Sequence, residues 1–221
     1  MRIHIKTTPN SEPVPFNYQP KLVGVLHKWL GANELHGKPA LHSFSWLLNA
    51  KVGKNGPDYP NGARLFISFY DDTYLKQVVK SIMNNADMCY GMKVTDVTLE
   101  ENPDLTNKTL FYCASPIFVR RLELETNKDI HYTFKDENAG SLLEETLLHK
   151  MELAGLPKDE SLKIRFDASF AGAKIKLIDY RGIKNRVNQC PVIIEGKPET
   201  KVFAWNVGIG NSTGVGYGAI Y

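Results

Sequence analysis

The chain has 221 residues, 43% of them hydrophobic and 23% charged, so it can bury one large core or two small ones. Its net charge of +3 is too small to indicate a partner, and its three scattered cysteines exclude a disulfide framework and a cysteine-based zinc site. No apolar run approaches membrane-spanning length and residues 1–20 lack the apolar core of a signal peptide, so we expect a cytoplasmic protein with no membrane partner.

The first half of the chain alternates between strand-like and helix-like patterns. Apolar residues at helical spacing, such as Leu26 and Trp29, predict a helix over residues 21–30 that ends before Gly31. Asp71 is a typical N-cap for a second helix that runs to about residue 85. Strands are expected at residues 1–6, 41–48, 64–70, 92–100 and 109–114. This β-α-β-β-α-β order is typical of the ferredoxin-like module, an antiparallel sheet backed by two helices.

The second half of the chain shows a similar but less regular pattern. A helix is expected over residues 141–153, where Ser141 and Glu144 form the Ser-x-x-Glu pattern of a capping box. The sequence Tyr180-Arg-Gly-Ile183 is typical of a hairpin turn. Strands are expected at residues 130–134, 162–170, 173–180, 186–195 and 200–207.

Residues 208–221 are rich in glycine, at positions 208, 210, 214, 216 and 218. This density predicts positive φ angles or the close approach of another backbone. The segment is not a nucleotide phosphate loop, because the Lys-Ser/Thr of a P-loop is missing and Thr213 takes the third glycine position of G-x-G-x-x-G. We expect a strand, a loop around residues 211–213 whose N–H groups form an anion-binding nest, and a final strand that ends at Tyr221. An irregular hairpin is the alternative.

Positive charge is concentrated in residues 162–186, where seven Lys or Arg residues stand against two Asp residues. Clustered cations predict a phosphate-binding surface, and a solvated strand face is the alternative interpretation. The seven are Lys163, Arg165, Lys174, Lys176, Arg181, Lys184 and Arg186.

Histidines gather in the first third of the chain. His27, His36 and His42 lie within sixteen residues of one another, and Glu34 is the one carboxylate among them. Histidine suits acid–base catalysis because its pKa lies near neutrality, whereas a metal-dependent nuclease needs several carboxylates. We therefore expect neither a metal ion nor a cofactor. The alternation around His42 favours a packing role for it, and the histidine spacing does not match a zinc motif.

The glycine loop has the form G-x-G-x-x-x-x-x-G-x-G, and the piece Ala114-Ser-Pro-Ile-Phe-Val119 precedes it in mid-chain. With the short N-terminal strand and the helix followed by a histidine pair, these motifs resemble the repeat-associated (RAMP) RNA-binding superfamily of CRISPR systems, and in particular its repeat-processing endoribonucleases. The resemblance implies an α+β fold of two ferredoxin-like modules packed side by side, the second irregular. We place the first module at residues 1–118 and the second at residues 119–221.

The resemblance also implies a catalytic site. Leu35-His36, followed by the strand Leu41-His-Ser-Phe-Ser-Trp46, matches the histidine context of the repeat-processing enzymes, so His36 is the first candidate. His27 stands where related proteins carry a tyrosine on the helix. Ala40 stands where they carry a lysine, and Lys38 is close enough to replace that lysine. His36 as base and His27 as acid is one assignment, and the reverse is equally open.

From the same resemblance we expect cleavage of precursor CRISPR RNA without metal, by attack of the RNA 2′-hydroxyl, to give a 2′,3′-cyclic phosphate. The expected partner is CRISPR repeat RNA rather than DNA. Its binding residues are expected in the glycine loop and in the basic hairpin, namely Gly208, Gly210, Asn211, Ser212, Thr213, Gly214 and Gly216, with Lys174, Lys176, Arg181, Lys184 and Arg186.

Two other readings stay open. A non-catalytic RNA-binding subunit of a CRISPR effector complex would share the loop and the hairpin but would not need His27 or His36, and Ala40 in place of the expected lysine favours it. A ferredoxin-like enzyme acting on small molecules would have no RNA affinity. The sequence also leaves open a homodimer.

Overall fold

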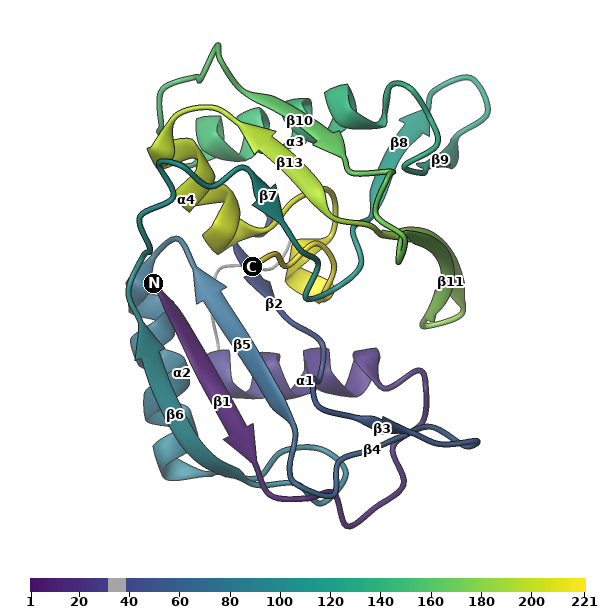
Figure 1. Cartoon of the computed structure of the whole chain (residues 1–221). Helices are drawn as coiled ribbons and strands as arrows, with labels where there is room; N and C mark the ends of the chain where they lie inside the picture. The colour runs from purple at the N-terminus through teal and green to yellow at the C-terminus, as the bar shows by residue number, and fades with distance from the viewer. Residues whose placement is uncertain (32–38) are drawn as a thin grey trace.

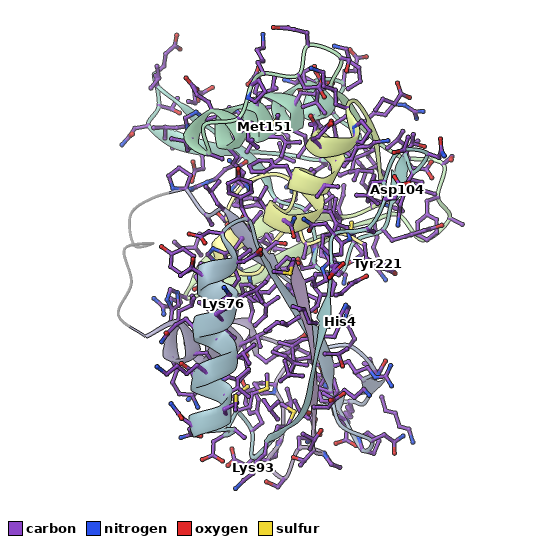
Figure 2. All side chains as sticks on the ribbon, turned by 90° about the vertical axis from the view of Figure 1, so that its left-hand side faces the viewer. His4, Lys76, Lys93, Asp104, Met151 and Tyr221 are labelled. Carbon is purple, nitrogen blue, oxygen red and sulfur yellow. The ribbon has the colours of Figure 1, made fainter. Side chains whose placement is uncertain are left out.

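The computed structural model of the chain describes residues 1–31 and 39–221. The predictions for His36 and Lys38 fall on residues 32–38 and so lie outside the described residues. Two large hydrophobic cores are present, one built from residues of the first half and one from residues of the second. In Figure 1 the second part is drawn above the first, and the C-terminal segment lies between them beside β2. Figure 2 shows their opposite ends, with Lys93 on the first part and Met151 on the second.

The first part is a four-stranded antiparallel sheet in the order β2-β5-β1-β6, with α1 and α2 packed together against it. This is the strand order of a ferredoxin-like module, and it confirms the predicted fold. A short hairpin, β3 (Lys51–Val52) with β4 (Pro57–Asp58), is attached to it. The principal elements are β1 (Arg2–Thr7), α1 (Gln19–Leu30), β2 (His42–Phe44), β5 (Arg64–Phe69), α2 (Asp72–Asn84) and β6 (Val94–Glu100).

The helices of this module form where the sequence predicts them. In α1, Leu26 and Trp29 are buried, as their spacing implies. In α2, the Asp71 side chain accepts a hydrogen bond from the Thr73 N–H at 2.9 Å, which caps the first turn. Both predicted helices are therefore confirmed.

The second part has a three-stranded antiparallel sheet in the order β10-β13-β7 and two separate hairpins, β8-β9 and β11-β12. Helix α3 packs on β10, and the two hairpins do not join the three-stranded sheet, so the module is irregular, as expected. Its elements are β7 (Leu110–Phe111), β8 (Val119–Glu123), β9 (Lys128–Tyr132), α3 (Ala139–Leu153), β10 (Lys163–Phe166), β11 (Lys174–Tyr180), β12 (Ile183–Gln189), β13 (Val192–Glu195), α4 (Pro198–Val207) and the 3₁₀ turn η1 (Thr213–Val215).

Four strand predictions differ from the structure. Residues 109–114 do not complete the first sheet, since β7 within them pairs with β13 of the second sheet. Residues 200–207 form helix α4, and the last residues form only an isolated bridge between Ile220 and Cys113 instead of a final strand. Residues 186–195 form two strands, β12 and β13, because Pro191 between them has no N–H to continue a ladder.

The predicted capping box at Ser141 was also wrong. Helix α3 begins earlier, at Ala139, and the Glu144 carboxylate accepts a hydrogen bond from the Ile164 N–H of β10 at 2.9 Å. The carboxylate thus joins α3 to β10 instead of capping its own helix. By contrast, the predicted turn at residues 180–183 is confirmed, since Arg181 and Gly182 both have positive φ (54° and 84°), as a tight two-residue hairpin turn requires.

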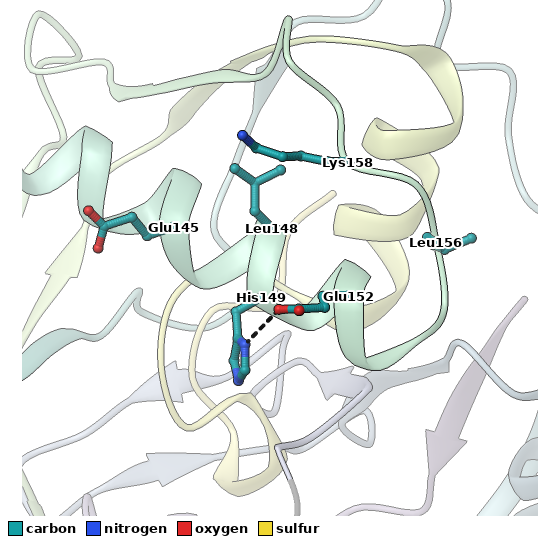
Figure 3. Close-up of a pocket in the computed structure, with 6 residues that line it drawn as sticks. All are labelled: Glu145, Leu148, His149, Glu152, Leu156 and Lys158. Carbon is teal, nitrogen blue, oxygen red and sulfur yellow. Dashed lines mark ion pairs between the residues drawn. The ribbon is translucent and has the colours of Figure 1, made fainter.

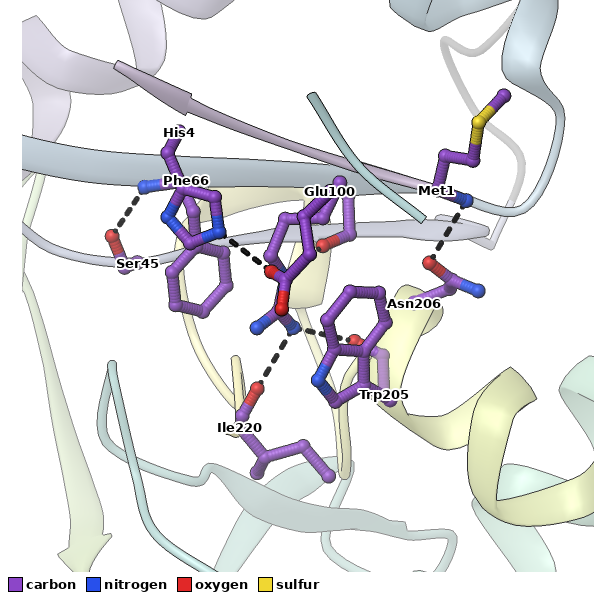
Figure 4. A network of polar contacts seen from close by, with 10 residues as sticks. Met1, His4, Ser45, Phe66, Glu100, Trp205, Asn206 and Ile220 are labelled. Atoms are coloured by element: carbon purple, nitrogen blue, oxygen red, sulfur yellow. Dashed lines mark hydrogen bonds and ion pairs between the residues drawn. The ribbon is translucent and has the colours of Figure 1, made fainter. Parts of the chain in front are cut away.

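Arg2 joins the two parts of the molecule. Its guanidinium is buried between the rings of Phe66 and Trp205, 3.7 and 3.5 Å from their centroids. It donates hydrogen bonds to the Ser68 hydroxyl and to the carbonyls of Trp205 and Ile220. Burial lowers its pKa to about 9. Figure 4 labels Phe66, Trp205 and Ile220 of this network, together with the nearby contact between His4 and Glu100.

The division of the chain at residue 118 stays a prediction. None of the described helices is both long enough and apolar enough to span a membrane.

Candidate active site

The glycine loop, residues 208–218, follows α4 and is held by backbone hydrogen bonds to the Ala114–Val119 piece. The Gly218 N–H donates to the Pro116 carbonyl and the Asn211 N–H to the Phe118 carbonyl, both at 2.8 Å. The Ser115 hydroxyl accepts from the Ala219 N–H at 2.9 Å. The glycine loop and the Ala114–Val119 piece, the two most specific motifs of the sequence, are therefore hydrogen-bonded to each other.

Two glycines of the loop are required by close backbone contacts. At Gly218 (φ 70°) a β-carbon would lie 1.9 Å from the Ile209 carbonyl oxygen, and at Gly210 (φ 80°) it would lie 2.4 Å from the Phe118 carbonyl oxygen. Positive φ and close approach, both predicted from glycine density, are confirmed at these positions.

The loop presents three successive N–H groups, those of Ser212, Thr213 and Gly214, that find no hydrogen-bond acceptor within the described part of the chain. Ser212 has left-handed backbone geometry (φ 59°, ψ 35°) and precedes the 3₁₀ turn. The N–H groups of Gly208 and Gly216 are instead used inside the protein, and both glycines are buried. An anion could therefore reach only the outer part of the predicted nest.

The glycine loop and α3 line a cleft of about 480 Å³, at which Ser212 and Gly214 are partly exposed and Thr213 is buried. Arg120 from β8, and His149 and Lys150 from α3, supply cationic or titratable side chains to its wall. The side-chain oxygen of Asn211 accepts a hydrogen bond from the backbone N–H of Arg120 at 2.8 Å, which joins β8 to the loop. The cleft is lined by Pro39, Ala40, Arg120, Thr146, His149, Lys150 and residues 210–215.

Lys150 is the residue of this site that the sequence analysis missed. It is buried, and its ammonium donates to Thr213 Oγ1 at 3.1 Å and to the carbonyls of Val207 and Gly208 at 3.3 and 3.4 Å. Burial lowers its pKa to about 7. A sequence signal did exist, because Lys150 falls on the same helical stripe as the buried Leu143 and Leu147.

His42 lies beneath the glycine loop. The residue is 6% exposed, and its ring stacks on that of Phe69 with centroids 4.9 Å apart, which agrees with a packing role. Burial, with smaller contributions from the charges of Lys150 and His27, lowers its pKa to about 4, so it is neutral near pH 7. A β-carbon on Gly214 would lie only 3.3 Å from its Cε1 atom.

Of the three predicted catalytic residues, the structure describes His27 alone. It is partly exposed on the last turn of α1, and its charge affects His42, so the two histidines belong to one electrostatic environment. Pro39 and Ala40, where the described chain resumes after residue 38, line the cleft. The site thus brings the end of α1, the start of β2, the glycine loop and α3 together.

The basic hairpin does not form a single positive face. In the β11-β12 ladder Lys176 lies opposite Val187 while Arg186 lies opposite Leu177, so Lys176 and Arg186 point to opposite sides. The side chains of Lys174 and Lys176 share one side, where the Lys176 ammonium lies 5.9 Å from the Trp46 ring centroid. Those of Lys184 and Arg186 occupy the other side, and Arg181 is at the exposed turn.

A second hollow, of about 530 Å³, lies along α3 beside the cleft. It is lined by acidic as well as basic side chains, and His149 of its rim forms an ion pair with Glu152 at 3.6 Å (Figure 3). His149 also lines the cleft, so it lies between the two hollows. In residues 1–31 and 39–221, no three His, Cys, Asp or Glu side chains are grouped so that they could hold a metal ion.

The paired α+β modules and the C-terminal glycine loop agree with the expected fold of a repeat-associated (RAMP) protein. A family model described as "CRISPR associated protein Cas6, C-terminal" matches residues 99–221, more than half of the chain. The chain therefore belongs to the CRISPR-associated Cas6 family.

Relatives match over the whole chain. The "Putative CRISPR-associated endoribonuclease-like protein Cas6" of Pyrococcus furiosus is 24% identical, over 100% of this chain and 98% of its own length. A solved structure of a Cas6-related gene product from Pyrococcus furiosus has a TM-score of 0.86 at 24% identity, covering 100% of this chain and 97% of that one. A structure described as a RAMP protein binding different RNA substrates has a TM-score of 0.85 at 22% identity, covering 100% and 98%. These likenesses support the fold.

Proposed function

We propose that this protein is a metal-independent endoribonuclease that binds CRISPR repeat RNA and cuts the precursor transcript once per repeat. The observation that carries the proposal is the cleft lined by the glycine loop, whose Ser212, Thr213 and Gly214 N–H groups find no acceptor among the described residues, by Arg120 and by the residues just before β2. The relatives described as endoribonuclease-like and as RNA-binding support it.

The proposed reaction is attack of the RNA 2′-hydroxyl on the adjacent phosphate. One histidine of the pair His27 and His36 removes the hydroxyl proton, and the other protonates the leaving 5′-oxygen, which leaves a 2′,3′-cyclic phosphate. Lys38 supplies positive charge in place of the lysine that Ala40 replaces. Charge on the phosphorane is stabilised by fixed N–H donors and cations, which act best when they are positioned before the reaction.

Two surfaces are proposed to hold the RNA. The outer glycine loop, through residues 210–214, binds backbone phosphate near the scissile bond. The hairpin contributes two separate sets of cations, with Lys174 and Lys176 on one side and Lys184 and Arg186 on the other, and Arg181 at the turn. Such contacts read the shape and phosphates of A-form RNA. An effector complex is a further proposed partner.

The test is to incubate the protein with end-labelled repeat RNAs in excess EDTA, beside His27→Ala, His36→Ala and a control, His4→Ala. His4 pairs with Glu100 at 2.6 Å on β6, outside the cleft. We expect one discrete cut by the wild type and by His4→Ala, and at least a hundredfold slower cutting by the other two with RNA binding retained, since a lost general acid or base costs about 10²–10⁴ in rate. Equal rates in all four would refute the assignment.

A second function, a non-catalytic RNA-binding subunit of a CRISPR effector complex, is favoured by one observation. Ala40 lines the cleft where the family pattern places a lysine, and it provides no charge there. Tight binding of the repeat without a cut by the wild type would support this function and exclude the enzyme.

A further inference from the structure

The strongest unused feature of the molecule is a buried lysine at the meeting point of three elements. The Lys150 ammonium comes from α3, and its acceptors are the Val207 and Gly208 carbonyls at the end of α4 and the Thr213 hydroxyl of the glycine loop. No carboxylate pairs with it among the described residues. A buried cation without a counter-charge is costly unless hydrogen bonds hold it, so its three acceptors matter for the stability of this junction.

The acceptors explain how the charge is held. Carbonyls at a helix C-terminus have no partner within the helix and carry partial negative charge, so an ammonium is favoured there. Val207 is the last residue of α4, and Gly208 is its C-cap. Lys150 therefore caps α4 from outside, and its third hydrogen bond extends from this cap into the loop.

The contacts continue from Thr213 to the candidate catalytic segment. Thr213 Oγ1 donates a long hydrogen bond, 3.5 Å, to the Ala40 carbonyl. Next to it, Gly214 packs so tightly that a β-carbon there would lie 2.8 Å from the Ala40 Cβ. Ala40 is two residues from His42 and β2, and two residues from Lys38 in sequence.

We propose that Lys150 is a positioning residue, which fixes the glycine loop through Thr213 and so holds the backbone at Ala40, where the segment bearing His36 and Lys38 joins β2. Lys150 acts through the loop and not on the reacting atoms. This inference rests on the proposed cleavage reaction, because it assigns a further residue to that site.

The chain provides a matched control. Lys201 is a second buried lysine of the same module, and its ammonium donates to the Thr106 and Lys108 carbonyls at 2.8 and 3.0 Å. It does not line the cleft. Lys150→Met and Lys201→Met both remove a buried ammonium from backbone acceptors, so a general loss of stability affects both, whereas a positioning effect is confined to Lys150→Met.

Single-turnover cleavage and RNA affinity separate the two effects. We expect Lys150→Met to cut repeat RNA at least tenfold more slowly than Lys201→Met. The Kd of Lys150→Met for RNA should stay within about threefold of that of the wild type. We expect Lys150→Arg to retain most of the wild-type rate. Equal rates for Lys150→Met and Lys201→Met, or a rate loss in Lys150→Met that matches its loss of RNA affinity, would overturn the proposal.

Hydrogen exchange tests the same contact without requiring cleavage. Amides of residues 40–44 are expected to exchange at least tenfold faster in Lys150→Met than in Lys201→Met, and faster also in Thr213→Val, which keeps the ammonium but removes the bridging hydroxyl. Unchanged exchange in both variants would overturn the positioning role. If the wild type cuts no RNA, the proposed function fails while the exchange measurement still decides whether Lys150 holds Ala40.

Discussion

Replacing Gly218 by alanine is expected to destabilise the protein through a backbone clash at the base of the glycine loop. Gly218 has φ 70°, and a β-carbon there would lie 1.9 Å from the Ile209 carbonyl oxygen and 3.0 Å from its carbon. The Ile209 N–H also donates to the Gly218 carbonyl at 2.8 Å, so the two backbones cannot separate without loss of a hydrogen bond. Any relief of the clash therefore distorts the loop.

The magnitude follows from two contributions. A left-handed backbone costs a non-glycine residue about 1–2 kcal/mol. Forcing an extra carbon into a closely packed site costs about 1–3 kcal/mol more. Gly182→Ala is the matched control, because Gly182 also has positive φ (84°) but lies in the exposed hairpin turn with no atom within 4 Å of the added carbon. It should show the first contribution alone.

Urea unfolding followed by circular dichroism measures the difference in the free energy of unfolding between the two variants. We expect Gly218→Ala to be less stable than Gly182→Ala by about 1–3 kcal/mol, equivalent to a melting temperature lower by roughly 2–12 °C for a chain of this length. Equal losses in the two variants would refute the argument that close approach, and not positive φ alone, requires glycine at position 218.

Three further predictions concern charge. The pKa of His42 is lowered to about 4 in the folded protein, so protonation of this histidine at low pH favours unfolding. The shift corresponds to about 3 kcal/mol in the free energy of unfolding, present above pH 6.5 and lost as the pH falls to 4. In His42→Phe the free energy of unfolding should therefore vary less with pH over that range. Arg2→Met should lower the melting temperature by several degrees, measured by calorimetry, because it leaves the Trp205 and Ile220 carbonyls without their donor. Lys184→Ala should reduce the salt dependence of repeat-RNA binding by about one unit of log–log slope, measured by titration at several salt concentrations, and an unchanged slope would exclude a phosphate contact.

The sequence predicted the elements that are buried on one side only. Helices α1 and α2 pack one face against a sheet, so apolar residues recur at helical spacing and the pattern is readable. Helix α4 is buried on nearly all sides, with Thr200, Lys201 and Asn206 inside as well as Phe203 and Trp205, so no periodicity distinguishes it from a strand. Its termini did carry signals, namely Pro198 in the first turn and Gly208 after the last.

The sequence predicted those parts of the candidate site in which the residue type alone indicates the local structure, and not those that depend on contacts between distant residues. The glycines of the loop are visible in the sequence because no other residue fits their backbone. For Lys150 the sequence gives opposing signals, because its helical position matches the buried stripe while a lysine side chain is typical of a solvated surface, and its acceptors lie 57–63 residues away along the chain. Likewise, the hairpin cations cluster in sequence, but strand alternation distributes them over two faces.

The Arg2 contact also bears on the order in which the protein is made. Arg2 and two of its hydrogen-bond acceptors, the carbonyls of Trp205 and Ile220, are more than two hundred residues apart, so the acceptors are synthesised long after β1 has left the ribosome. During translation β1 can pair with β5 and β6 to form the first sheet. The Arg2 guanidinium, however, must stay hydrated until the C-terminal segment has been synthesised. Completion of the first module is thereby coupled to the last residues of the second, so the two modules are expected to reach their final packing together.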